Sequence, residues 1–210
     1  MKYKITLLLY IIATSSVFSQ KTERIRYEKI LSFNFPSYYT KTDTLGLLRY
    51  MGTDSTGIYQ CIVAADKTFG SPQNKAELEN SYRECLKGMA LNLPGYSFVD
   101  SSMISLGELR ALKSTFENSS SDPETTMENL MIFLDGNLFT FVVVLPGKDE
   151  EVVERLFGSI EIDPSITANN QFIAQEKSRP ELIGELIGYG CMVIISIGII
   201  IIIARRANKS

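Results

Sequence analysis

Hydrophobic and polar positions alternate in the first third of the chain in the way that is typical of strands. Residues 30–36 carry the run Ile-Leu-Ser-Phe-Asn-Phe and stop at Pro36, which predicts a short strand. Residues 45–51 and 58–65 predict two more strands, and the glycine-bounded turn at 52–57 joins them in a hairpin. The charged residues 21–29 are expected to form an irregular lead-in.

The pattern then changes to a helical period. Apolar residues recur at three- and four-residue spacing until Pro94-Gly95, which predicts a helix from about residue 72 to residue 91 with one face against a sheet. Ser71 followed by Pro72 is the expected start of this helix. The expected core face consists of Leu78, Tyr82, Cys85 (or Leu86), Met89 and Leu93.

The second half of the domain returns to strands. Residues 96–103 and 109–116 predict two strands, followed by a polar loop at 118–124. Residues 130–134 and 138–145 are almost continuously apolar and are joined by Asp-Gly-Asn, so we expect a hairpin of central strands covered on both faces.

A short amphipathic helix is expected to close the domain. Asp149 can cap it, and Glu150 and Glu151 in its first turn suit the helix dipole. Its apolar side is expected to face the core through Val152, Val153, Leu156, Phe157 and Ile160.

The two ends of the chain predict targeting and anchoring. Residues 1–19 combine a basic start with a short apolar core, as in a signal peptide that is cut after Ser19. An uncleaved N-terminal anchor is the alternative. The globular domain is then residues 20–162, and the aperiodic polar residues 163–181 are expected to be a linker.

Residues 182–204 predict one C-terminal transmembrane helix. The stretch 186–204 has no charged residue, and as a helix it would span roughly 28 Å, close to the thickness of a bilayer core. Arg205 and Arg206 begin a tail at 205–210 that the positive-inside rule leaves in the cytoplasm. Gly184 and Gly188 stand four apart and could let two helices pack in a homodimer. A C-terminal sorting signal is a further reading of this region.

The amino-acid composition limits the kinds of function that the protein can have. The chain of 210 residues contains no histidine, which removes the usual general base and the commonest metal ligand. Five basic residues lie at the extreme termini, so the region between them is more acidic than the net charge of -3 suggests, and we expect no nucleic-acid binding. No spacing of carboxylates or serines singles out a catalytic site, so we expect no catalytic, cofactor-binding or metal-binding residues.

Two cysteines lie in the predicted domain, and a third, Cys191, lies in the apolar run. In an oxidising compartment Cys61 and Cys85 could form a disulfide. The favoured interpretation is that both are small buried hydrophobic residues.

The order of predicted elements resembles the PsbP-like family between about residues 33 and 162. The likeness rests on the short Phe-x-Phe-Pro strand at 33–36, the segment Leu-Gly-Glu-Leu-Arg-Ala at 106–111, the hairpin at 135–137 and the helix end at 156–160. The resemblance implies an α+β fold, an antiparallel sheet flanked by helices in an α/β/α sandwich. It also implies a non-enzymatic role in binding or assembling membrane-associated complexes, as in bacterial envelope proteins or chaperones that shelter transmembrane segments.

The sequence therefore predicts a single-pass protein of the cytoplasmic membrane with its domain on the outer side. The leading hypothesis is a non-catalytic binding or assembly module that contacts the lipid bilayer through its anchor and an envelope protein through the sheet or the loops at 52–57 and 118–124. Alternatives are a sensor or immunity-type protein whose transmembrane helix contacts a membrane partner, and a C-terminally sorted surface protein. An enzyme is the least favoured class.

Overall fold

The computed structural model describes residues 22–44, 47–65, 72–120 and 123–172. Within these ranges, no helix is long and apolar enough to cross a membrane. The predicted signal peptide at 1–19, the span at 182–204 and the tail at 205–210 lie outside the described residues, as do Gly184, Gly188, Arg205 and Arg206.

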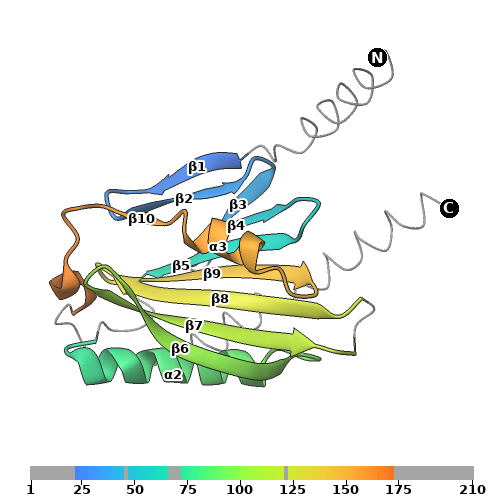
Figure 1. Ribbon diagram of the computed structural model, residues 1–210. Helices are drawn as coiled ribbons and strands as arrows, with labels where there is room; N and C mark the ends of the chain where they lie inside the picture. The colour runs from blue at the N-terminus through green and yellow to red at the C-terminus, as the bar shows by residue number, and fades with distance from the viewer. Residues whose placement is uncertain (1–21, 45–46, 66–71, 121–122, 173–210) are drawn as a thin grey trace, which may run out of the picture.

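The centre of the fold is a large antiparallel sheet of seven strands (Figure 1). The hairpin of apolar strands lies at its middle, as predicted, because both faces of these strands are covered. In spatial order the strands are β3 (Tyr39–Thr44), β4 (Leu47–Thr53), β5 (Ile58–Ala65), β9 (Asn137–Pro146), β8 (Thr125–Leu134), β7 (Leu109–Asn118) and β6 (Ser97–Leu106).

The turn between β8 and β9 shows how a local sequence sets the register. Asp135 and Gly136 both have positive φ, at 47° and 74°, which is the conformation of a type I′ turn. Leu134 therefore pairs directly with Asn137, and every apolar side chain along the two strands is assigned to a face.

A second, three-stranded sheet packs on the large one, in the order β1 (Thr22–Tyr27), β2 (Leu31–Pro36) and β10 (Glu161–Ile162). The prediction of a lead-in at 21–29 was wrong for residues 22–27, because these residues form β1. The strand buries a single apolar side chain in its middle, Ile25, between two arginines, which is a weak signal for a strand. The polar edge strand β3 was missed for the same reason.

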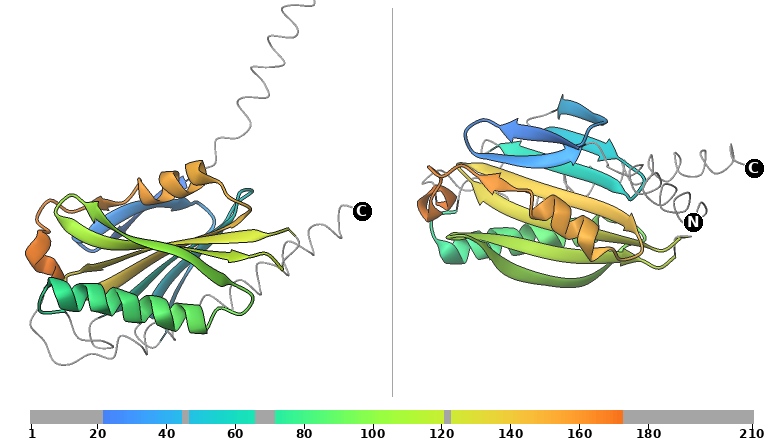
Figure 2. Two further views of the ribbon diagram at one scale, coloured as in Figure 1. Left: turned by 60° about the horizontal axis from the view of Figure 1, so that its bottom comes forward. Right: turned by 45° about the horizontal axis from the view of Figure 1, so that its top comes forward.

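The described domain has three layers (Figures 1 and 2). Helix α2 (Lys75–Leu91) covers one face of the large sheet, and the small sheet together with helix α3 (Glu150–Phe157) covers the other. The prediction of an antiparallel sheet with flanking helices is therefore confirmed in its coarse form. The sheets dominate, however, and the second face is covered mainly by strands rather than by a helical layer.

Helix α2 buries the predicted residues Leu78, Tyr82, Cys85 and Met89. Of the residues predicted to face the core from the short helix, Val152, Val153 and Leu156 are buried, while Phe157 and Ile160, which lies beyond the end of α3, are partly buried.

Helix α2 starts later than expected, at Lys75, and the side chain of its N-cap residue Asn74 accepts a hydrogen bond from the Glu77 backbone N–H at 3.0 Å. The predicted cap Ser71 lies outside the described residues. Helix α3 starts as predicted, since the Asp149 carboxylate accepts from the Val152 N–H at 3.1 Å.

The predicted linker at 163–181 begins too early. Residues 163–172 belong to the domain and include the short 3₁₀ helix η2 (Ala168–Gln171). The backbone N–H of Asp163 donates to the carbonyl of Ile30 at 2.8 Å, and Gln171 is fully buried. The segment has no periodicity because turns and side-chain hydrogen bonds, rather than an amphipathic pattern, hold it in place.

Candidate functional site

An open groove of about 380 Å³ lies between the two sheets, beside β1. The small sheet packs across the large sheet. At the end of β1, the ring of Tyr27 packs edge to face on Phe139 of β9, with 5.1 Å between the ring centres. Part of β3, β4 and β5 is left uncovered there. The groove is lined by Arg26, Tyr27, Glu28, Lys41, Asp43, Leu48, Tyr50, Val63 and Ala65.

Charges of both signs stand on the two walls of the groove. Arg26 and Glu28 belong to the β1 wall, and Lys41 and Asp43 belong to β3. All four side chains are exposed, and within the described part of the chain none of them forms an ion pair. The groove therefore offers exposed charged groups of both signs to a charged or polar ligand.

The floor of the groove is apolar and aromatic. Burial, followed by the negative charge of Glu28, raises the pKa of Tyr27 above its ordinary value. Burial also raises the pKa of Tyr50, although Lys41, whose Nζ lies 5.5 Å from the ring centre, opposes the shift. Both phenols therefore stay protonated near neutral pH, and they can donate hydrogen bonds but cannot act as bases.

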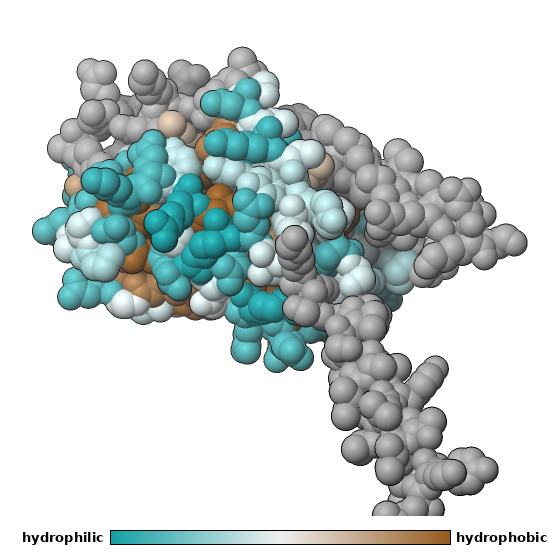
Figure 3. All heavy atoms as spheres, turned by 90° about the horizontal axis from the view of Figure 1, so that it is seen from above, coloured by the Kyte–Doolittle hydropathy of each residue, from teal (hydrophilic) through white to brown (hydrophobic). Residues whose placement is uncertain are grey.

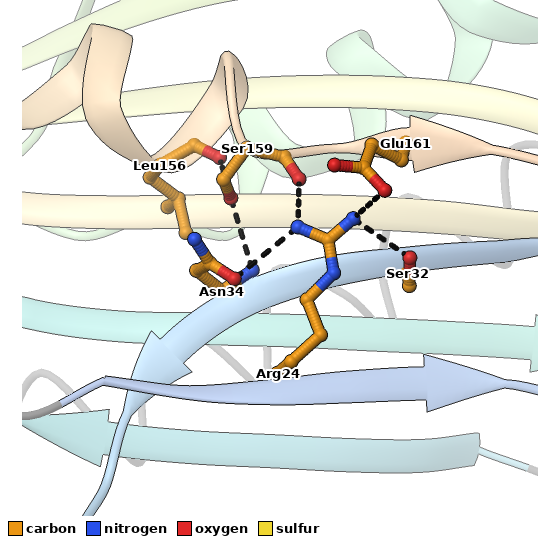
Figure 4. Close-up of polar contacts among 6 residues, drawn as sticks. All are labelled: Arg24, Ser32, Asn34, Leu156, Ser159 and Glu161. Atoms are coloured by element: carbon orange, nitrogen blue, oxygen red, sulfur yellow. Dashed lines mark hydrogen bonds and ion pairs between the residues drawn. The ribbon is translucent and has the colours of Figure 1, made fainter.

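An arginine holds the β1 wall in place (Figure 4). Nη1 of Arg24 donates to the carbonyl of Ser159 at 2.9 Å and to Asn34 Oδ1 at 3.2 Å, while Nη2 donates to Ser32 Oγ at 2.8 Å. The same guanidinium forms an ion pair with Glu161. Strand β1 is thereby fixed to β2, to the end of α3 and to β10, so that the wall is preorganised.

The side of the molecule that carries the small sheet mixes hydrophilic residues with hydrophobic patches (Figure 3). A mixture of this kind is the ordinary composition of a protein surface, so the groove is distinguished by its shape and its lining residues.

The two loops predicted to bind a partner lie at one end of the large sheet, and the groove lies at the other. The β4–β5 turn is rigid, since the Asp54 carboxylate accepts hydrogen bonds from the N–H groups of Thr56 and Gly57 at 2.8 and 3.1 Å. The β7–β8 loop joins the end of β7 to the start of β8 at this same end of the large sheet. The large hydrophobic side chains that are exposed in the described ranges are also at this end: Tyr38, Leu91, Phe98 and Val99.

The cysteines lie on opposite sides of the large sheet. Cys61 on β5 belongs to the core beneath the small sheet, and Cys85 on α2 belongs to the other core. Within the described residues neither cysteine forms a disulfide, and both are buried. The alternative of a Cys61–Cys85 disulfide is therefore wrong for this structure, because the sheet separates the two residues, and the favoured interpretation as small buried hydrophobic residues holds.

Sequence reasoning missed the groove because its walls come from two segments that were not predicted as strands. The available signal was the alternation of Arg24 and Arg26 with Ile25 and Tyr27, which has the period of a half-buried strand. Within the described ranges, no group of three or more metal-ligating side chains could hold a metal ion.

Comparisons with known proteins give a likeness of structure alone. No family model matches the chain, and no match is found among curated proteins. The solution structure of cyanobacterial PsbP from Synechocystis is similar with a TM-score of 0.48 and 11% identity, over 70% of this chain and 95% of that one.

Two further solved structures are similar at lower scores. The Ran-binding protein Mog1p of Saccharomyces cerevisiae has a TM-score of 0.40 and 7% identity, over 74% of this chain and 100% of that one. A protein of Bacteroides thetaiotaomicron has a TM-score of 0.41 and 16% identity, over 63% of this chain and 44% of that one. Likenesses at this level assign neither a partner nor an activity to this chain.

Proposed function

We propose that this protein is a non-catalytic binding or assembly module, tethered to the outer face of the cytoplasmic membrane, that recognises an envelope protein through the groove beside β1. The observation that carries the proposal is the groove itself. It combines four charged side chains, none of which forms an ion pair with another described residue, with an apolar, aromatic floor, and these are the features of a site that orients a polypeptide.

The groove chemistry favours recognition over catalysis. Its two phenols are held in the protonated form by burial, and no histidine is available anywhere in the chain as a general base. Exposed carboxylates and cations of the kind found on the walls are well suited to charge complementarity with a partner.

The location and the family are part of the same proposal. The signal-peptide pattern at 1–19 and the uncharged stretch at 186–204, followed by Arg205 and Arg206, support a single-pass protein with its domain outside. A PsbP-like domain is supported by the sequence resemblance and by the element order. Among the described residues, a strand ending at Pro36 is followed by three antiparallel strands, one long helix, four antiparallel strands and a short helix.

A chimera tests the tethered module. Residues 186–204 are replaced by an unrelated transmembrane segment, and native membranes are crosslinked before affinity purification. We expect the chimera and the natural chain to recover the same partner. Loss of the partner in a chimera that is inserted and folded would show instead that the transmembrane segment makes the contact, and failure of both chains to recover any partner would contradict the binding function.

A further inference from the structure

We propose that the free edge of β1 receives an extended peptide segment, acidic on one face and apolar on the other, as an additional strand of the small sheet. This inference rests on the proposed function and names the chemistry of the partner.

The first support is the position of β1 at an edge. Within the part of the chain that the structure describes, β1 pairs with β2 alone, through all six residues of Thr22–Tyr27. An edge strand presents unpaired backbone N–H and C=O groups, and adding a strand to such an edge is a recurring mode of peptide recognition.

The second support is the space beside that edge. An added strand would run next to β1 in the layer of the small sheet, about 10 Å above the large sheet. Its inward side chains would enter the groove of about 380 Å³, where the partly exposed Leu48 and the mostly buried Tyr50 and Val63 form the floor beside Lys41 and Asp43. Apolar side chains at alternate positions of the guest suit this floor.

The third support is the charge on the outer face of β1. Ile25 is buried against the large sheet, so its neighbours Arg24 and Arg26 point to the opposite face of the strand. Arg24 already forms an ion pair with Glu161, whereas Arg26 forms none within the described residues. A carboxylate opposite Arg26 would make a favourable cross-strand pair, so the guest's outer face should be acidic.

The same charges argue against a second copy of this chain as the occupant. In an antiparallel pair related by a twofold axis through the sheet, residues directly opposite each other lie on the same face. If the two copies paired through the middle of β1, Arg24 would therefore lie opposite Arg24 or Arg26 of the second copy. Like charges directly opposite each other are destabilising.

Peptide binding to the full chain in detergent tests the inference. The probe is a fluorescent decapeptide of alternating aspartate and valine, and the comparison peptide replaces each aspartate by lysine. Two more aspartate peptides carry N-methyl groups, one on the odd-numbered residues and the other on the even-numbered residues. Each of them therefore lacks the backbone N–H donors along one edge of the bound strand. Fluorescence anisotropy measures each dissociation constant.

The expected result has three parts. The aspartate peptide binds saturably, the lysine peptide binds at least roughly tenfold more weakly, and one N-methylated peptide loses binding while the other retains it. Arg26→Glu reverses the preference between the aspartate and lysine peptides. The control Arg83→Glu, an equal charge change on α2 across the large sheet, leaves the preference as it was.

Several results would overturn the inference. Strand addition would be contradicted if the aspartate and lysine peptides bound equally well, or if Arg26→Glu left the preference between them unchanged. It would also be contradicted if both N-methylated peptides bound as well as the unmethylated one. Dimers in sedimentation that disappear in Arg26→Glu would make a second copy the occupant. If no peptide binds while native membranes still yield a partner, the strand-addition model fails and the binding module stands.

Discussion

Gln171 pairs with the backbone of Arg110 as a neighbouring strand residue would. Its Oε1 accepts a hydrogen bond from the Arg110 N–H at 2.9 Å, and its Nε2 donates to the Arg110 carbonyl at 2.8 Å and to the carbonyl of Phe133 at 3.1 Å. The side chain is 1% exposed. Gln171 thus satisfies the backbone hydrogen-bonding groups of a residue 61 positions earlier, near the start of β7. These bonds also fix the C-terminal end of the described domain.

Replacing Gln171 by alanine should destabilise the domain. The substitution removes three hydrogen bonds and leaves the Arg110 N–H without this partner in a buried setting, at a cost of about 1–3 kcal/mol, while the Arg110 carbonyl keeps the hydrogen bond from the Tyr82 hydroxyl. The free energy of unfolding is measured by denaturant titration. The neighbouring Asn169→Ala changes an exposed side chain and serves as the control. Equal stability of both variants would show that the segment is not held by this side chain.

The contacts of Arg24 allow a separation of hydrogen bonding from ion pairing. Glu161 is 75% exposed, so its ion pair should contribute only about 0–1 kcal/mol, and Glu161→Gln should be close to neutral. Arg24→Ala also removes hydrogen bonds to three other groups on β2 and at the end of α3, and should cost about 1.5–3 kcal/mol.

The same denaturant titration compares the two variants. A loss of stability in Glu161→Gln as large as that in Arg24→Ala would assign the stabilisation to the ion pair instead.

The two domain cysteines should be unreactive until the protein unfolds. Burial raises the pKa of the Cys61 thiol, and it raises that of Cys85 to about 12, so neither is a thiolate near neutral pH. In a Cys191→Ser background, a thiol reagent should label neither residue in the native protein and both residues in denaturant. Mass spectrometry gives the number of labels. Rapid native labelling, or a mass lower by two hydrogens, would contradict buried thiols that form no disulfide with each other.

Glu128 should make stability depend on pH. Burial raises the pKa of this carboxyl above its ordinary value of 4.5, although hydrogen bonds from Thr115 and the charge of Lys113 oppose the shift. Since the folded state holds the proton more tightly, the favourable contribution is complete below pH 4.5 and is lost as pH rises through the folded-state pKa.

Thermal unfolding at a series of pH values tests this effect. From pH 4.5 upward, the natural chain should lose stability relative to Glu128→Gln, while Glu108→Gln, at an exposed turn, should follow the natural chain. A Glu128→Gln curve parallel to that of the natural chain would show that the carboxyl titrates normally.

Much of the fold could be predicted from the sequence, because strong periodic patterns coincide with buried faces. The apolar hairpin around Asp135 and Gly136 became the middle of the large sheet, and the helical spacing from Leu78 to Leu93 marked the buried side of α2. In these segments local propensity and tertiary packing favour the same structure.

The groove could not be predicted in the same way. Its walls are edge strands that bury few side chains, so their hydrophobic signal is weak, and pairing with distant strands stabilises them. The ordered segment that ends at Gln171 has no period, because it is held by single hydrogen bonds over long sequence distances. Contacts of this kind leave no pattern in a short window of sequence.

Site-specific photocrosslinking tests the central claim of a binding groove most directly. A photoreactive residue replaces Lys41 at the groove wall in the full chain, and a matched chain carries it at Arg83 on α2, across the large sheet. After irradiation of native membranes, the Lys41 position should yield one discrete adduct with an envelope protein, and the Arg83 position should not. The same adduct from both positions, or an adduct from Arg83 alone, would contradict the assignment of the groove as the binding site.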